Sequence, residues 1–502
     1  MKDVKRFSLI SMIFLVALRV GPTQSTNAAS RPNVLFIAVD DLNDWIGCLG
    51  GHPQTVTPNM DRLANRGVLF TNAHCAAPAC NPSRAAIFSG RHPHQTGVYS
   101  NSSPRIRTAQ PDLVLLPQHF QKAGYRTLGT GKLLHSKPKG VFQEEFFPEQ
   151  RWSPFRRDQV EYSAQELPSK GSDHPRHVVE NGPGGLRYIL PLNRMPSDRN
   201  PRNPKGESFD WGPFPLPDSA MGDGQITDWA IKQLKRKDAV EPFFLAVGYY
   251  RPHIPLYAPQ RYFDLLPPED QIQLPSVLEK DLDDLSPSAK KWALEAVTAG
   301  GHATVLRFQQ WQAAVRAYLA CIAFVDTQIG RLLDGLDTSA HGENTIVVLW
   351  GDHGWHLGEK QHWGKWTGWQ RSTRVPLIVV PAKRSDQPGY AAGGRCRQPV
   401  SLVDLYPTLI ELCQLPKKAD LVGVSLVGLL AKPDQATDRL AVTFFDPGNV
   451  SLTGTRWHYI RYQDGSEELY HIGNDPHEWH NLAGSPSHQE VVKRFRRRLP
   501  PQ

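Results

Sequence analysis

Residues 34–41 read Val34-Leu35-Phe36-Ile37-Ala38-Val39-Asp40-Asp41, so that six apolar residues run directly into two carboxylates. A continuous apolar run of this length is typical of a β-strand that is buried on both faces. Residues 346–350 form a second run of this kind, which ends in Gly351-Asp352-His353-Gly354. Residues 243–247 and 377–380 have the same character. We therefore expect all four segments to be buried strands.

Helical patterns lie between these strands. Residues 59–66 are followed by Gly67, residues 116–123 are followed by Gly124, and the longest pattern covers residues 311–336. Strands that alternate with helices predict an α/β fold with a central sheet. Ligands of such sheets bind at the carboxyl ends of the strands, which is where both acidic clusters fall.

The composition narrows the class of protein. A chain of 502 residues is long enough for one large domain and a smaller one. The net charge of +8 fits either an acidic ligand or a basic soluble surface. Apart from a short basic tail at 493–498, no dense Lys/Arg run indicates nucleic acid binding. With six cysteines spread over 502 residues, the chain does not resemble a disulfide scaffold.

The N-terminus has the pattern of a secretory signal peptide, which we place at residues 1–29. Basic residues come first, an apolar stretch follows at 9–20, and Ala28-Ala29 offers small residues for cleavage. An uncleaved membrane anchor is the alternative, but the apolar stretch is too short to span a bilayer comfortably. We expect export, without a stable membrane anchor, to a periplasm, to the exterior or, in a eukaryotic host, to the lysosome.

We divide the rest into a catalytic domain at 30–436 and a small C-terminal α+β subdomain at 437–502, in which residues 457–470 predict a β-hairpin. Residues 136–211 have little periodicity and much Pro, Gly and Arg, which predicts a long surface insertion. Its arginines either meet an anionic substrate or, as we favour because Asp and Glu offset them, belong to a solvated loop. They are Arg151, Arg156, Arg157, Arg176, Arg187 and Arg194.

Asp40, Asp41, Asp352 and His353 converge if their two strands are neighbours. Three carboxylates in one place repel each other unless a cation joins them, and oxygen ligands favour Ca²⁺ or Mg²⁺. The alternative is that Asp40-Asp41 caps a turn. Zinc, with His356 and His362 as further ligands, is a less favoured reading.

Residues 80–84 read Cys80-Asn81-Pro82-Ser83-Arg84. Pro82 and the alanines after it predict a helix that starts at this point. Residue 80 then lies at the positive helix end, where anionic oxygens are favoured, and Arg84 lies one turn further on the same side. A buried structural cysteine is the alternative for Cys80.

Three further segments carry basic side chains of interest. Lys132 and His135 face the same way if they share a helical turn, and they suit sulfonate binding and proton transfer. His253 lies between prolines just after the strand at 243–247, and Lys365 lies between two tryptophans. The alternatives are an ordinary surface feature for the Lys132/His135 pair, loop packing for His253 and a surface position for Lys365.

Together these segments resemble the type I sulfatases of the alkaline phosphatase superfamily, from Asn33 to about residue 482. Residues 80–90 match the C-x-P-S-R signature, and residues 124–135 match a second one. The segments Asp352-His353-Gly354-Trp355, 131–135 and 251–255 resemble the iduronate-2-sulfatase group of that family.

The resemblance implies a fold with a central mixed sheet flanked by helices, and an active site with assigned roles. It implies that Cys80 is oxidised to formylglycine by a formylglycine-generating or anaerobic sulfatase-maturating enzyme, and that one Ca²⁺ is bound. The implied calcium ligands are Asp40, Asp41, Asp352, His353 and modified Cys80. The implied catalytic residues are Cys80, the nucleophile; Arg84, which holds its hydrate; His135, the base; Lys132 and Lys365, which bind sulfate; and His253, which binds sulfate or protonates the leaving alcohol.

The implied activity is that of a sulfuric ester hydrolase on a sulfated glycan, with a 2-O-sulfated uronate as the expected substrate. Another sulfated sugar, choline sulfate, or a phosphodiester or phosphonate substrate are the alternatives. A non-catalytic glycan-binding relative ranks lowest, because every matched position is filled.

Overall fold

The computed structural model describes residues 31–137, 140–161, 177–196, 208–236, 242–296, 300–383 and 389–500. Its centre is an eight-stranded sheet in the order β15-β2-β14-β11-β1-β9-β4-β5, in which β14 runs antiparallel to both of its neighbours and the other pairs are parallel. The predicted mixed sheet is therefore confirmed. Its strands are β1 (Asn33–Val39), β2 (Val68–Phe70), β4 (Arg126–Gly131), β5 (Glu144–Phe146), β9 (Phe243–Tyr249), β11 (Thr345–Gly351), β14 (Leu377–Val380) and β15 (Gly394–Cys396).

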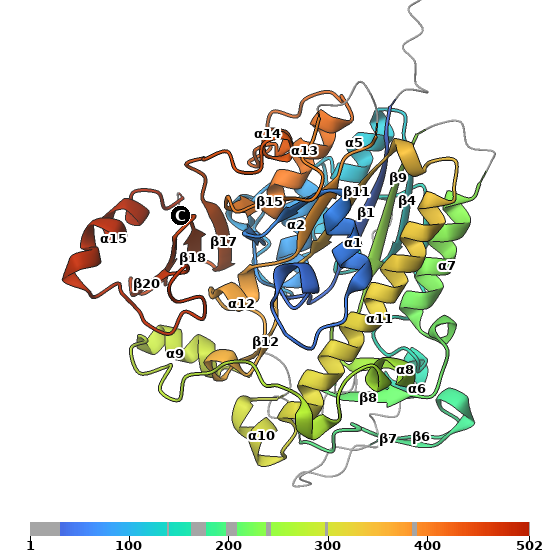
Figure 1. Ribbon diagram of the computed structural model, residues 1–502, viewed down its shortest axis with the longest axis horizontal. Helices are drawn as coiled ribbons and strands as arrows, with labels where there is room; N and C mark the ends of the chain where they lie inside the picture. Colours follow the sequence, from blue (N-terminus) through green and yellow to red (C-terminus); the bar gives the residue numbers. More distant parts are fainter. Residues whose placement is uncertain are drawn as a thin grey trace, which may run out of the picture.

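The side chains of β1 alternate between two hydrophobic cores, as the pleat of a strand requires. Leu35, Ile37 and Val39 pack in one core with α1 (Pro58–Arg66), α7 (Gly222–Leu234) and α11 (Trp311–Asp337). The intervening residues pack in the other core with α2 (Cys80–Ser89), α5 (Leu116–Lys122) and α13 (Leu405–Leu412). Figure 1 shows α11 and α7 running side by side along the sheet.

Helix α11 has the length and apolar composition of a membrane span, and among the described helices no other does. In the structure, 83% of the most apolar 18-residue stretch of this helix is buried. This position is typical of the core helix of a globular domain.

The remaining elements are short. The other helices are α3 (Pro93–Thr96), α4 (Ile106–Ala109), α6 (Arg157–Glu161), α8 (Gln260–Asp264), α9 (Pro287–Leu294), α10 (His302–Arg307), α12 (Gln370–Thr373), α14 (Val427–Ala431) and α15 (Gln489–Arg496). The other strands outside the C-terminal sheet are β3 (Ala73–His74), β6 (His177–Val179), β7 (Tyr188–Leu190), β8 (Trp211–Phe214), β10 (Leu256–Pro259), β12 (His356–Leu357), β13 (Trp363–Gly364) and β16 (Val400–Ser401).

The segment 136–211 differs from the predicted solvated loop, as far as its residues are described. β5 extends the central sheet by pairing in parallel with β4, and Trp152 and Phe155 are buried in the core below it. For these residues the prediction was wrong, because their contacts with the rest of the fold leave no periodic pattern in the sequence. Four arginines of the segment are exposed as predicted: Arg156, Arg157, Arg187 and Arg194. Arg176 and the proposed signal peptide at 1–29 lie outside the described residues.

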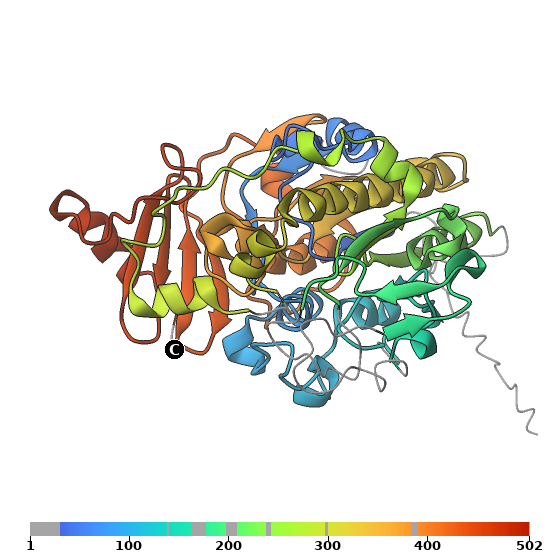
Figure 2. The same cartoon turned by 90° about the horizontal axis from the view of Figure 1, so that it is seen from below.

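The C-terminal part forms a separate four-stranded antiparallel sheet of β17 (Ala441–Asp446), β18 (Asn449–Thr453), β19 (Trp457–Arg461) and β20 (Glu467–His471). The predicted hairpin is confirmed as β19 and β20. Helix α9 packs on one face of this sheet and α15 packs on the other. Figure 2 shows the sheet at the opposite end of the molecule from α7.

Glu468 of β20 connects this sheet to the segment after β13. Its carboxylate is 1% exposed and accepts hydrogen bonds from Trp369 Nε1 at 2.8 Å, Tyr462 Oη at 2.7 Å and Tyr470 Oη at 2.5 Å. A carboxylate that is buried this deeply stabilises the fold only while its donors are in place.

We predict that Glu468→Gln lowers the free energy of unfolding by about 2 kcal/mol, because the amide turns an NH₂ group toward donors and weakens charge-assisted hydrogen bonds. The change is nearly isosteric, so a cavity does not contribute. Thermal melting followed by circular dichroism measures the effect. Glu490→Gln on the exposed face of α15 is the control, and an equal melting temperature for both variants would contradict the prediction.

Candidate active site

The register of the central sheet aligns the carboxyl ends of four neighbouring strands. Val39 of β1 pairs with Gly351 of β11 and with Tyr249 of β9, and Gly131 of β4 pairs with Gly248 of β9. The residues that follow each strand therefore leave the sheet at one edge. This alignment confirms the predicted convergence of the two acidic clusters.

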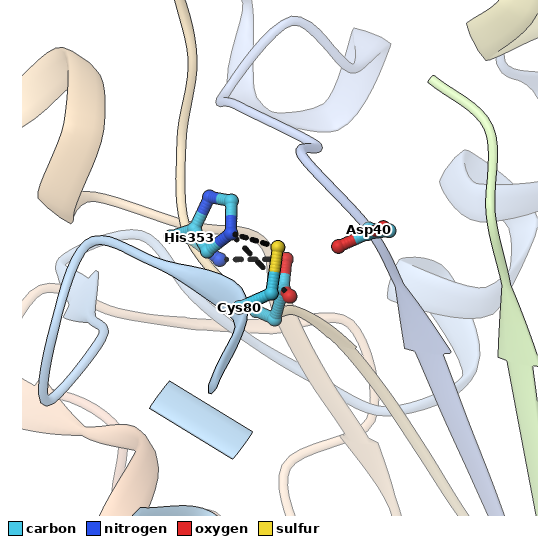
Figure 3. Close-up of side chains that lie close together, drawn as sticks. Asp40, Cys80 and His353 are labelled. Carbon is cyan, nitrogen blue, oxygen red and sulfur yellow. Dashed lines mark hydrogen bonds and ion pairs between the residues drawn. The ribbon is translucent and has the colours of Figure 1, made fainter. Parts of the chain in front are cut away.

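Asp40 and His353 reach toward the sulfur of Cys80 from the ends of β1 and β11 (Figure 3). One oxygen or nitrogen from each of Asp40, Asp352 and His353 and the Cys80 sulfur all lie within 4.8 Å of one another. Asp41 joins through a second group of the same kind that contains Asp40, Cys80 and His253. All five predicted metal ligands thus occupy one buried site, and His253 borders it.

The acidic side chains suit a divalent cation. Oδ1 of Asp41 accepts a hydrogen bond from Lys365 Nζ at 2.7 Å, whereas its Oδ2 is buried without a hydrogen-bond partner. Burial raises the pKa of Asp41 to about 7 and that of Asp352 to about 6. Asp40 is equally buried, yet Lys132, His253 and Arg84 hold its pKa below the usual value. Buried carboxylates with an oxygen left over fit a hard, oxygen-binding ion.

His353 is oriented as a metal ligand would be. Its Nδ1 lies 3.1 Å from the Gly354 carbonyl oxygen, which can only accept, so Nδ1 carries the proton and Nε2 faces the site. The two further histidines of the zinc reading point elsewhere. His356 Nε2 meets Thr367 Oγ1 at 3.0 Å, and His362 Nε2 lies 2.8 Å from the Lys365 carbonyl oxygen.

Cys80 occupies the first turn of α2, as the sequence predicted. Its sulfur lies 3.0 Å from Lys365 Nζ, 3.3 Å from His353 Nε2 and 3.4 Å from Lys132 Nζ. Burial opposes ionisation of the thiol, but these neighbours outweigh it and hold the pKa of Cys80 well below its usual range. An anionic group is thus stabilised at residue 80, which favours a functional role for Cys80 over that of an inert structural cysteine.

Arg84 is fully buried one turn along α2. Its Nε donates to Asp352 Oδ2 at 2.8 Å, a terminal nitrogen donates to Asp40 Oδ1 at 3.3 Å, and another donates to the Lys132 carbonyl. In this arrangement Arg84 ties the two acidic strand ends and the segment after β4 together. The structure shows these contacts in place of a hydrogen bond from Arg84 to residue 80.

Lys132 and His135 both face residue 80. The predicted helical turn between them is wrong, since the residues after β4 form a series of bends. The close approach of β4 and β9 fixes Lys132. A Cβ on Gly248 would lie 2.1 Å from the Lys132 carbonyl oxygen, and a Cβ on Gly131, at φ +72°, would lie 2.1 Å from the Gly248 carbonyl oxygen. Both positions therefore require glycine.

His253 and Lys365 are buried, with exposures of 5% and 4%, so the surface reading of Lys365 is wrong. Nδ1 of His253 lies 2.6 Å from the Ile254 carbonyl oxygen and carries the proton, which leaves Nε2 facing Asp41 Oδ2 at 3.7 Å. Burial, Lys132 and Lys365 hold the pKa of His253 well below its usual range.

Sequence reasoning missed two aromatic walls of this site. The Tyr250 ring lies 4.8 Å from Lys132 Nζ and 4.6 Å from the His253 ring, and the Trp355 ring lies 5.4 Å from Lys365 Nζ. Tyr250 directly follows β9 and Trp355 follows the Asp352-His353 pair. Their positions next to strand ends were the available signal.

Comparisons with known proteins identify the family of the chain. The family model described as "Sulfatase" matches residues 32–415, and the one described as "N-sulphoglucosamine sulphohydrolase, C-terminal" matches residues 358–502. A sulfatase of Formosa agariphila is 36% identical, over 99% of this chain and 92% of its own length. Iduronate 2-sulfatase of Mus musculus is 30% identical, over 82% of this chain and 73% of its own length.

A solved structure in complex with D-glucosamine-2-N,6-O-disulfate has a similar fold. Its TM-score is 0.68 at 21% identity, and the match covers 93% of this chain and 97% of the other. At that identity the likeness concerns the fold.

We predict that protein stripped by a chelator binds one divalent cation and that Asp41→Asn weakens this binding about 10- to 100-fold, because the variant removes a charge from a buried ligand set. Isothermal titration calorimetry with CaCl₂ and MgCl₂ measures the affinity without any need for turnover. Asp44→Asn is the control, since Asp44 pairs with Arg371 and Arg374. Equal cation affinity in the two variants would count against the site.

Proposed function

This chain belongs to the sulfatase family and hydrolyses sulfate esters, and from this premise we propose that its substrate is a glycan that carries a 2-O-sulfated uronate. The observation that supports this reaction is that residue 80 lies in one buried site with Lys132, Lys365, His353 and three carboxylates. The similarity to an iduronate 2-sulfatase supports the choice of sugar. The proposal includes export by residues 1–29 and a catalytic domain at 30–436 followed by a subdomain at 437–502.

We propose formylglycine, made from Cys80 by a maturating enzyme that supplies the oxidant, as the nucleophilic residue. The hydrated aldehyde offers two hydroxyls, one to attack sulfur and a second whose deprotonation releases sulfate and restores the aldehyde. A thiol has no second hydroxyl. The environment of residue 80 supports the proposal, because the groups that hold the pKa of its thiol down would equally favour an oxyanion there.

Asp40, Asp41, Asp352, His353 and residue 80 would hold a calcium ion. Bound there, the ion would favour the ionised form of a hydroxyl and draw a sulfate oxygen toward the site. Arg84 keeps Asp40 and Asp352 in place.

The protein's own side chains handle the charge and the protons. Lys132 and Lys365 are largely buried, where charge contacts are strong, and they would offset the negative charge on the sulfate oxygens. His135 accepts the proton from a hydroxyl at residue 80. His253 donates a proton to the alcohol oxygen as its bond to sulfur breaks. Burial first, and then Lys132 and Lys365, hold the pKa of His253 down, and a bound sulfate anion would offset the two lysines and so raise the pKa of His253 toward the range in which the ring can donate a proton.

We predict that Cys80→Ala lowers sulfate release from a 2-O-sulfated uronate disaccharide by at least about 10³-fold, because the nucleophile is lost. Ion chromatography measures sulfate, and mass spectrometry of wild-type protein establishes the aldehyde at residue 80. Cys48→Ala is the control, since Cys48 is the least buried cysteine. Substantial sulfate release by Cys80→Ala, or release of phosphate from a phosphodiester in place of sulfate, would contradict the proposal.

We predict that His253→Gln lowers kcat for the sugar sulfate about 10²- to 10³-fold, because an alkoxide needs a proton as it leaves. For an aryl sulfate, whose phenolate leaves without one, we expect a fall of less than about tenfold. Cation affinity of the variant, measured as above, separates this effect from damage to the metal site. Equal losses on both substrates would show that His253 does not act as the acid.

A further inference from the structure

An open cleft of about 720 Å³ adjoins the active site. Lys132 and His135 line it together with described residues of the insertion, including residues 147–151 and Arg157. One acidic residue, Glu149, faces four basic ones among the described lining: Lys132, Lys137, Arg151 and Arg157. The cleft therefore suits a substrate with negative charge beyond the sulfate ester itself.

Arg151 differs from Arg156, Arg157 and Arg187, which are paired with carboxylates, and from Arg194, which is exposed. Arg156 pairs with Asp158, Arg157 with Glu149 and Arg187 with Glu180. Arg151 is half-buried and has no carboxylate partner among the residues that the structure describes.

The guanidinium of Arg151 is held at one end. Its Nε donates to Tyr250 Oη at 2.9 Å, and its carbon lies 6.0 Å from the centre of the Trp152 ring. Within the described chain its two terminal nitrogens have no protein acceptor, and the residue lines the cleft. A fixed guanidinium with free terminal N–H groups is arranged to bind a carboxylate or sulfate through two parallel hydrogen bonds.

Tyr250 connects Arg151 to the reacting groups. The Tyr250 hydroxyl accepts from Arg151, and the Tyr250 ring packs against Lys132 Nζ and against the ring of His253. Tyr250 first, and then Cys80 and Asp40, raise the pKa of Arg151, although burial lowers it. The charge of Arg151 therefore interacts with the groups at the centre of the site. An anionic group bound at Arg151 would lie one side chain away from the residues proposed to hold the sulfate.

We propose that Arg151 forms a second anion subsite that binds a carboxylate or a further sulfate on the saccharide that bears the scissile ester, so that the preferred substrate is at least dianionic. This inference rests on the proposed function. It corrects the expectation that the arginines of the insertion are all solvated.

The test compares Arg151→Gln with wild type on three substrates. They are a 2-O-sulfated uronate disaccharide, the same disaccharide with its carboxylate methyl-esterified, and N,6-disulfated glucosamine. A monoanionic aryl sulfate serves as the reference. We expect kcat/KM for the dianionic substrate to fall about 10- to 100-fold, mainly through KM, as for loss of a charged hydrogen-bonded pair, and that for the aryl sulfate to change less than about threefold.

The substrates also identify the anionic group. If the carboxylate is bound, esterification weakens wild type and removes its sensitivity to Arg151→Gln. If a second sulfate is bound, the sensitivity appears with the disulfated glucosamine. Arg151→Lys should recover part of the loss, since it keeps the charge without the fork. Arg156→Gln, an exposed arginine of the same segment, should behave as wild type.

Equal losses on the aryl sulfate and the sugars, matched by Tyr250→Phe, would overturn the subsite and leave Arg151 as a support for Tyr250. Calorimetric binding of the dianionic sugars to Cys80→Ala, with and without Arg151→Gln, tests the subsite without turnover. Unchanged affinity there overturns the inference, whereas weaker binding together with an inactive wild-type enzyme contradicts the proposed function alone.

Discussion

The confinement of three carboxylates away from water is the constraint on which the site depends. The parallel pairing of β1 with β11 places Asp40, Asp41 and Asp352 at one level of the sheet, where they are fully buried. Their repulsion must be balanced locally, because no solvent screens it. Arg84 and the lysines after β4 and β13 supply positive charge, and the leftover oxygen of Asp41 leaves a place for a cation. The same balance that keeps the carboxylates buried also prepares a surface for an anionic substrate.

Much of this arrangement could be predicted from the sequence, because it depends on local signals. Apolar runs mark β1, β9, β11 and β14 almost to the residue, and polar residues directly after such runs must emerge at the edge of the sheet. The helix that begins at Cys80 is announced by Pro82 and the alanines after it. The family resemblance, confirmed by the comparisons, added the assignment to sulfate ester hydrolysis.

The failures have one physical cause, which is that burial depends on partners far away in the chain. The burial of Trp152 and the isolation of Arg151 from any described carboxylate are set by contacts across the fold. Over the whole insertion, Asp and Glu residues balance the arginines in number. The ion pairs, however, form between particular neighbours, and Arg151 is not part of one. Lys132 likewise owes its position to the approach of two glycines on different strands.

Lys365 and Trp369 lie four residues apart on one segment, with the first at the sulfur of Cys80 and the second bound to Glu468 of the C-terminal sheet. The segment from Lys365 to Trp369 is thus attached, through Trp369, to a part of the chain that contributes no residue to the site. The strands of the C-terminal sheet therefore support the site by holding the segment that bears Lys365 in position. A fragment that ended before β17 would keep every acid and base of the site and yet lack the anchor that keeps one of its cations in place.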